Sequence, residues 1–339
     1  GDTPALVDGP LLHAQSTAVE IGHGIHRRGA GEAYFLSCSR SPGSGCFQQV
    51  IQVLFRICTG EDDITRLEHT PAAALGSCRK KLPKMGDEGG EEVYSRLLDI
   101  FKKYDIRYFF YIGGNDSMDT VAKLSEYTKG HEYEMRIIGV PKTIDNDLVG
   151  TDHTPGFPSA AKYIAVTMQE IIRDCAVYTT KAVTIVEIMG RDSGWLTTAS
   201  AIGRVVNGVA PDYVYLPERT FSMEQFFSDV RAALAKHPNV VIAVSEGVRF
   251  ADGRYVCEGI GVESTDAFGH KQLSGTGKAL ELAVKAELGC KVRSIELNLP
   301  QRCAAHIASV QDLTESVAVG RAAVKAAAEG LSREMMLII

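Results

Sequence analysis

The sequence predicts an α/β protein built on parallel sheet covered by helices on both faces. From about residue 90 onward, apolar strand-length runs alternate with amphipathic helical segments. The strand runs lack the polar alternation of a sheet with one solvated face, which indicates burial on both faces. With 339 residues and 45% apolar content, the chain is long enough for one large or two ordinary α/β domains.

The individual elements follow from the spacing of their apolar residues. The 3.6-residue period predicts helices over residues 92–103, 116–129, 158–175, 222–237, 275–289 and 313–330. Apolar runs that end in glycine, proline or acidic residues predict strands over residues 106–114, 135–142, 182–190, 212–218, 239–247 and 292–298. Residues 1–60 show poor periodicity and loop-like composition, so no strand is placed there.

Charge and cysteine usage narrow the class of protein. The net charge of −6 argues against a nucleic-acid binder, which would show a basic face. The longest apolar stretches are of strand length, so no membrane span is expected. The eight cysteines include no CxxC pair, and a chain with this much core needs no disulfides, so we interpret them as reduced thiols of a cytoplasmic protein.

The first candidate site residues follow the strand at 106–114, in the run YIGGNDSMDT. Gly113 and Gly114 would let the backbone approach a ligand, and Asp116 or Ser117 could cap the helix that follows. A helix start presents free N–H groups that suit a phosphate. An ordinary capped turn is the alternative for this pattern taken alone.

The second candidate stretch, PKTIDNDL, follows the next strand. One of its carboxylates, Asp145 or Asp147, could accept a proton from a hydroxyl, and the other could hold Mg²⁺, which prefers oxygen ligands. Lys142 could neutralise a phosphate as a point charge. An Asx-rich turn explains the acidic pair equally well in isolation. Function is favoured because the ends of adjacent parallel strands share one crevice.

Further charged residues follow later strands, and each alone is best explained as a surface charge. They are Arg191 in VEIMGRDSG, Glu246 in VSEGV, Arg293 and Arg302 in VRSIELNLPQRCAAH, and Arg79 in LGSCRKKLPK. The sequence lacks a Cys/His set for zinc, a GxSxG elbow and a P-loop motif.

Taken together and in order, the motifs LGSCR, GGNDS, PKTIDNDL, MGR, SEG and R…QR resemble the 6-phosphofructokinase family over roughly residues 63–330. The resemblance implies a fold of two doubly wound, mostly parallel sheets with helices on both faces. It implies phosphoryl transfer to the 1-hydroxyl of fructose 6-phosphate.

The resemblance also implies roles for individual residues. Asp145 would be the general base, Asp147 would organise Mg²⁺ together with Asp116, and Thr143 would contact the transferred group. The donor phosphate would be bound by Arg79, Gly113, Gly114, Asn115, Asp116 and Ser117, with Lys142 supplying a cation. The sugar phosphate would be bound by Met189, Gly190, Arg191, Glu246, Arg293 and Arg302.

The donor is indicated by two positions in this resemblance. ATP-using members usually carry glycine where this chain has Asp116 and Lys142, and the pyrophosphate-using branch resembles this chain at both. An aspartate in the glycine turn fills and charges the space of an ATP α-phosphate. The resemblance therefore favours a reversible pyrophosphate-dependent enzyme over an ATP-dependent one.

The resemblance further implies a domain organisation. Residues 61–156 and 302–339 would form the phosphoryl-donor domain, and 157–301 the sugar-phosphate domain. Residues 1–60 would be a divergent first segment of the donor domain, because AQSTAVEI at 14–21 lacks the family's glycine-rich turn. A catalytically impaired sugar-phosphate-binding homologue is therefore a further alternative. The expected partners are fructose 6-phosphate, pyrophosphate and further copies of the chain in a homodimer or homotetramer.

Overall fold

The computed structural model describes residues 34–35, 81–258 and 273–339. The chain forms two compact units. The first unit takes in the described residues up to Thr143, together with Asp147–Gly156 and Ser309–Ile339. The second unit takes in Ile144–Asn146 and Phe157–Ala308. The sequence placed the return to the first unit at 302, and the structure has it at Ser309.

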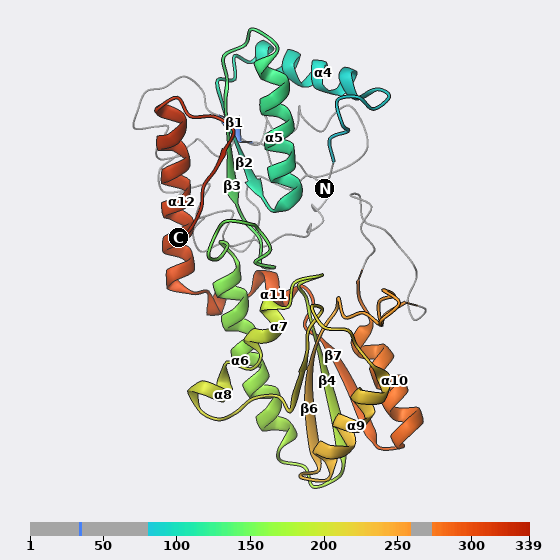
Figure 1. Cartoon of the computed structure of the whole chain (residues 1–339). Coiled ribbons are helices and arrows are strands. Elements are labelled where there is room, and N and C mark those ends of the chain that lie inside the picture. The colour runs from blue at the N-terminus through green and yellow to red at the C-terminus, as the bar shows by residue number, and fades with distance from the viewer. Residues whose placement is uncertain (1–33, 36–80, 259–272) are drawn as a thin grey trace, which may run out of the picture. The chain divides into compact units, whose positions relative to one another are not determined.

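The first unit is built on a parallel sheet of the order β1-β2-β3-β8. Its strands are β1 (Tyr34–Phe35), β2 (Tyr108–Gly113), β3 (Arg136–Pro141) and β8 (Glu334–Met335), and its helices are α4 (Gly90–Lys103), α5 (Asn115–Lys129) and α12 (Val310–Ala328). Helix α5 lies on one face of this sheet and α12 on the other, as Figure 1 shows. Buried side chains of β2, β3 and the three helices form one core.

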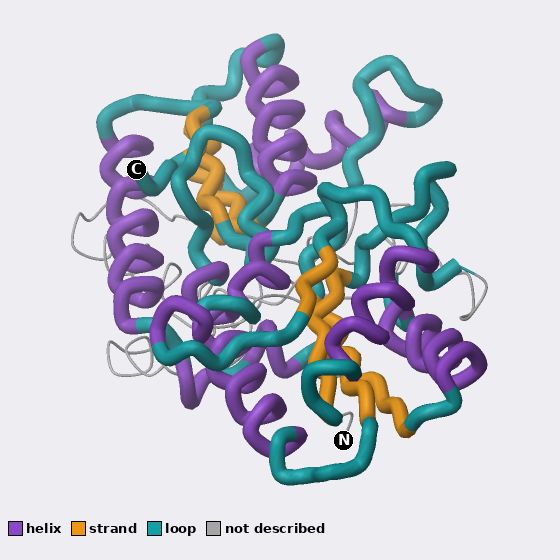
Figure 2. Tube along the Cα trace, turned by 60° about the horizontal axis from the view of Figure 1, so that its bottom comes forward, coloured by secondary structure: helices purple, strands orange, loops and turns teal. Residues whose placement is uncertain are grey.

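The second unit is built on a parallel sheet of the order β5-β6-β4-β7. Its strands are β4 (Ala182–Ile188), β5 (Tyr213–Tyr215), β6 (Asn239–Ser245) and β7 (Lys291–Glu296). Its helices are α6 (Phe157–Cys175), α7 (Trp195–Ala199), α8 (Gly203–Val206), α9 (Met223–Leu234), α10 (Thr276–Leu288) and α11 (Pro300–Cys303), with a 3₁₀ turn, η1 (Ala305–Ile307). Figure 2 shows these strands, in orange, running between helices.

The period of two along β4 explains why the second sheet is covered on both faces. Val183 and Ile185 join a core with α9 and α10, whereas Val186 and Ile188 join a second core with α6 and α7. Since alternate residues of a strand point to opposite faces, every residue of β4 from Val183 onward is buried on one side or the other. The predicted α/β fold class with helices on both faces of parallel sheets is therefore confirmed.

Several short elements of the structure were not predicted from the sequence. The apolar tail forms β8, which pairs with β3. The short helices α7, α8 and α11 were not predicted either, since they contain too few residues for a helical period. None of the described helices is long and apolar enough to cross a membrane.

Candidate functional site

The two candidate stretches of the first unit lie side by side because β2 and β3 are paired in register to their ends. Gly113 pairs with Pro141, and the backbone N–H of Lys142 donates to the carbonyl of Gly113 at 3.0 Å. A Cβ placed on Gly114 would lie 3.7 Å from the Cβ of Thr143. The structure thus brings Gly113 and Gly114 beside Lys142 and Thr143, as the adjacent strand ends predicted.

The start of α5 differs in one respect from the prediction. Gly114 is the N-cap residue with extended backbone, and α5 begins at Asn115, so the predicted cap by Asp116 or Ser117 is wrong. Both side chains lie within the first turn instead. The position of Gly113 leaves no room for a side chain, because a Cβ there would lie 1.9 Å from Oγ of Ser117.

The two predicted metal-binding carboxylates both belong to the first unit. Asn115 donates from Nδ2 to Oδ2 of Asp147 at 2.7 Å, which connects the start of α5 to the loop after β3. The Oδ1 atom of Asp116 lies 3.8 Å from Nζ of Lys81. Within the described ranges, no group of three or more His, Cys, Asp or Glu side chains forms a ready metal site. The first unit thus offers two carboxylates, those of Asp116 and Asp147, and divalent magnesium is commonly held by one or two carboxylates plus substrate phosphates.

In the second unit, Asp145 lies beside the turn that follows β4. Ser193 donates from Oγ to the carbonyl of Asp145 at 2.8 Å, and its own N–H closes the turn onto Gly190 at 2.9 Å. The preceding Ile144 is buried in the core against α6 and α7. The following Asn146 has a positive φ of 55°, which turns the chain sharply after Asp145. The backbone of Asp145 is therefore held from both sides.

The turn after β4 is fastened by a buried carboxylate. Gly190 and Arg191 have φ values of 143° and 51°, and their N–H groups both donate to Oε1 of Glu246, at 3.2 and 3.0 Å. Gly247 must be glycine, because a Cβ there would lie 1.7 Å from the carbonyl oxygen of Arg191. This contact places three of the predicted sugar-phosphate residues, Gly190, Arg191 and Glu246, in one cluster.

Gln301 completes the turn and was missed from the sequence. Its buried side chain accepts at Oε1 from the N–H of Met189 at 3.2 Å. Arg302 is the next residue on α11 and is half-buried. A glutamine beside a candidate arginine gave no sequence signal of its own, since its partner lies 112 residues away in the chain.

Two predicted site residues remain, Arg293 and Arg79. Arg293 is exposed in the middle of β7 and pairs with Thr184, ahead of the carboxyl end of β4. Arg79 and the segment 1–60, apart from the two residues of β1, lie outside the described residues.

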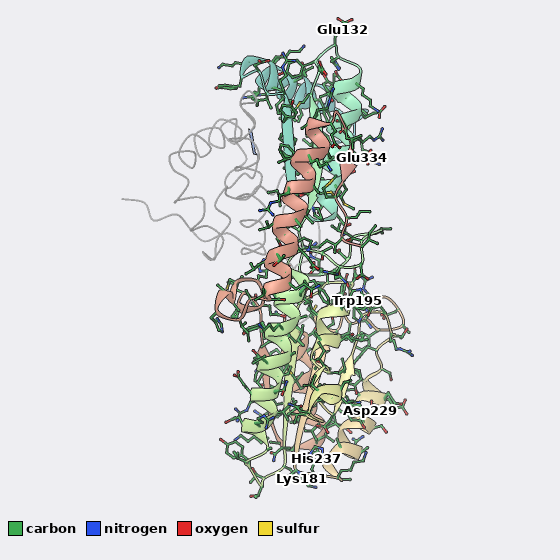
Figure 3. The ribbon with its side chains drawn as sticks, turned by 90° about the vertical axis from the view of Figure 1, so that its left-hand side faces the viewer. Glu132, Lys181, Trp195, Asp229, His237 and Glu334 are labelled. Atoms are coloured by element: carbon green, nitrogen blue, oxygen red, sulfur yellow. The ribbon has the colours of Figure 1, made fainter. Side chains whose placement is uncertain are left out.

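Figure 3 labels Lys181 and His237 at the amino end of the second sheet and Trp195, the first residue of α7, at the opposite end.

Two buried carboxyl groups of the second unit have pKa values well above the ordinary value of a carboxyl group. Burial raises the pKa of Glu246 to about 7, against the lowering effect of the Arg191 N–H, and Asp145 raises it further. Burial likewise raises the pKa of Glu187 to about 7, although the N–H groups of Gly277 and Gly275 donate to it at 2.7 and 3.2 Å. The sequence contains no signal for Glu187, which sits within an apolar strand and serves the start of α10.

Glu246 provides a testable pH dependence of stability. A raised carboxyl pKa means that the folded chain binds a proton more tightly than the unfolded chain, so stability is lost as pH rises through about 7. Glu246→Gln should remove most of that slope, roughly 1 kcal/mol per pH unit between about pH 5 and 7. The amide oxygen can still accept both N–H groups that Oε1 accepts. Urea unfolding of both proteins from pH 5 to 8 measures the difference, and equal slopes would contradict it.

The sequence matches the model of a known protein family. Residues 44–325 match the family model described as phosphofructokinase, and the chain belongs to that family.

Several curated relatives have the same name. The chain is 42% identical over 277 residues to a pyrophosphate–fructose 6-phosphate 1-phosphotransferase of Xanthomonas campestris, covering 81% of this chain and 65% of that protein. A protein of the same name from Halomonas elongata is 41% identical, with 82% and 66% covered. The chain thus spans about two thirds of the length of these relatives. A sulfofructose kinase of Alkalicoccus urumqiensis is 33% identical, with 81% and 68% covered.

Solved structures agree with the family. The pyrophosphate-dependent phosphofructokinase from Marinobacter aquaeolei is similar with a TM-score of 0.78 and 32% identity, covering 97% of this chain and 76% of that one. Phosphofructokinase of Pichia pastoris, at 17% identity and a TM-score of 0.68, shares the fold.

Proposed function

We propose that this chain transfers a phosphoryl group from pyrophosphate to the 1-hydroxyl of fructose 6-phosphate, giving fructose 1,6-bisphosphate and phosphate. One observation carries the proposal: the ends of β2 and β3 bring the Gly113–Gly114 turn, with Asp116 after it, beside Lys142 and Thr143. This is the combination that distinguishes a small, highly charged donor from a nucleotide. The names of the relatives support the same reaction.

The donor phosphates would be bound at the start of α5. The N–H groups of a helix's first turn point away from the helix, and their dipole favours an anion. Lys142 would add a full positive charge next to that turn. Lys81 lies 3.8 Å from the carboxylate of Asp116. The carboxylate of Asp116 occupies space that a nucleotide α-phosphate would need.

Magnesium would be held by Asp116 and Asp147 together with phosphate oxygens of the donor. When bound, Mg²⁺ would neutralise charge on the phosphates during transfer. Asn115 would orient Asp147 through its 2.7 Å hydrogen bond. Asn115 itself is uncharged, so the two aspartates supply the anionic ligands.

Asp145 would act as the general base. Its carboxylate would accept the proton of the sugar's 1-hydroxyl while that oxygen forms a bond to phosphorus. The bond from phosphorus to the bridging oxygen would break at the same time, and phosphate would leave with the electron pair.

The sugar would be held by the turn after β4 and by Glu246. Among the described residues, Oε2 of Glu246 accepts no hydrogen bond, because both donors use Oε1, so Oε2 is available for a sugar hydroxyl. Arg191 and Arg302 would bind the phosphate through guanidinium forks. Arg293, which is exposed on the edge strand β7, would be a further cation for the same phosphate.

Catalysis would depend mainly on positioning and charge neutralisation, as is usual for phosphoryl transfer. The transfer should run in both directions, because the transfer potentials of pyrophosphate and the sugar bisphosphate differ less than those of ATP and the sugar bisphosphate. The enzyme is proposed to be a cytoplasmic homodimer or homotetramer.

The purified chain should form fructose 1,6-bisphosphate with pyrophosphate and Mg²⁺, at a kcat/KM at least about 100-fold above that with ATP, a difference of about 2.7 kcal/mol in transition-state stabilisation. Product formation is measured by coupled assay, with EDTA as the metal-free control. Preference for ATP would instead indicate an ATP-dependent phosphofructokinase. No turnover with either donor, but measurable fructose 6-phosphate binding by calorimetry, would indicate an impaired homologue. Sulfofructose is the competing acceptor to include, because one relative carries that name.

A further inference from the structure

The proposed catalytic stretch, Lys142–Asp147, is hydrogen-bonded to a second segment, Thr151–Gly156, which we call the support segment. The N–H of Thr143 donates to the carbonyl of Pro155 at 3.1 Å, and Thr154 donates from Oγ1 to the carbonyl of Thr143 at 2.8 Å. Thr154 is fully buried. Any movement of this support segment therefore moves the backbone of Thr143.

The support segment is in turn attached to the C-terminal part of the first unit. The N–H of Gly156 donates to Oδ1 of Asp312, a fully buried residue of α12, at 3.0 Å. The N–H of Asp152 donates to the carbonyl of Ile338 at 2.8 Å, and the N–H of Ile338 donates to Oγ1 of Thr151 at 3.0 Å. Both α12 and the C-terminal tail are thus hydrogen-bonded to the support segment.

His153 is the titratable member of this attachment. Its Nε2 atom lies 2.6 Å from Oε2 of Glu315 on α12, and its Nδ1 atom lies 3.4 Å from Oδ2 of Asp152. Gln311 donates to the other oxygen of Glu315 at 2.8 Å, which orients the carboxylate toward the ring. The side chains of His153 and Glu315 are only 19% and 23% exposed, so water screens the pair weakly.

We propose that His153 and Glu315 form a pH-responsive clamp that positions Thr143 of the proposed catalytic stretch through the support segment. The role in turnover rests on the proposed function, whereas the clamp itself is a property of the folded chain. Both are positioning residues, because they act on the reacting groups only through Thr143, Pro155 and Thr154.

The physical basis is the number of hydrogen bonds that the ring can donate. A protonated imidazole donates from both nitrogens, and here each nitrogen faces a carboxylate. A neutral ring donates from one nitrogen only. Burial lowers the pKa of His153, but the hydrogen bonds and charges of Glu315 and Asp152 outweigh burial and raise that pKa above its ordinary value. The clamp is therefore fully closed below the ordinary histidine pKa and weakens as pH rises through the raised value.

The clamp is tested first without any assay of activity. Proton NMR titration of the histidine C2–H signals follows the nine histidines, and loss of one signal in His153→Asn assigns His153. We expect its midpoint to fall by about one pH unit or more in Glu315→Gln, because an opposite charge at this distance shifts a pKa by about 1–3 units. Glu329→Gln is the matched control, since this exposed glutamate at the opposite, C-terminal end of α12 lies 4.0 Å from Lys325 and should leave the midpoint unchanged. An ordinary midpoint in the unmodified protein would overturn the clamp.

The positioning role is tested by steady-state kinetics across pH 6–9 with whichever donor the chain uses. In the unmodified chain, kcat should decline at the high-pH side with the His153 midpoint. In Glu315→Gln that decline should move to lower pH and kcat at pH 7.5 should fall by about tenfold, with the sugar-phosphate KM changed less than about twofold. An unmoved pH profile would overturn the positioning role. A shifted NMR midpoint in a chain without pyrophosphate activity would contradict the proposed function and leave the clamp standing.

Discussion

Asp145→Ala is expected to lower kcat by about 10²–10⁴-fold, because a positioned general base contributes that much to a proton transfer. The KM for fructose 6-phosphate should change by less than about threefold, since the sugar would be held by the turn after β4 and by Glu246. The backbone contact of Asp145 with Ser193 uses its carbonyl and survives the substitution. Initial-rate kinetics with saturating pyrophosphate and Mg²⁺ measure the effect.

Asp252→Ala serves as the matched control for Asp145→Ala. Asp252 is an exposed aspartate of the same unit whose side-chain hydrogen bonds, among the described residues, all go to Arg254. Its replacement should leave kcat within about twofold. A loss of less than about tenfold in Asp145→Ala would show that another group accepts the proton, and the role of Asp145 would be withdrawn.

Replacing Lys142 with glycine is expected to lower kcat/KM for pyrophosphate by about 10²–10³-fold, because it removes the positive charge that we propose binds the donor phosphates. Adding Asp116→Gly should then raise kcat/KM for ATP, since it removes a carboxylate from the first turn of α5 and releases Lys81. Parallel assays with both donors give the ratio of specificities, which should invert in the double variant.

Asp119→Ala is the matched control for this pair of substitutions. Asp119 lies one turn further along α5 and pairs with Lys123 at 2.6 Å, away from the glycine turn. Glycine in a helix costs up to about 1 kcal/mol, so circular dichroism and thermal melting must show that the double variant is folded. An unchanged donor ratio in a folded double variant would contradict the donor assignment.

Much of the candidate site could be predicted because its residues follow strands. The pairing of β2 with β3 to their last residues brings Gly113 and Gly114 beside Lys142 and Thr143, as the order of apolar runs and polar ends indicated. Glu246 likewise follows β6 and reaches the turn after β4, because those two strands are neighbours. The helix cap was predicted two or three residues too late, since glycine, aspartate and serine are all common caps and only backbone geometry separates them.

The sequence by itself determined the alternation of strands and helices, the faces that they bury and the order of the site motifs, because these depend on local periodicity and on residue type. Only the tertiary structure decided that Gln301 holds Met189, that Glu187 serves the start of α10 and that His153 meets Glu315. Each of these contacts joins residues 88 to 162 positions apart. Such contacts depend on how whole elements pack, and a short stretch of sequence carries no record of the partner that packing brings to it.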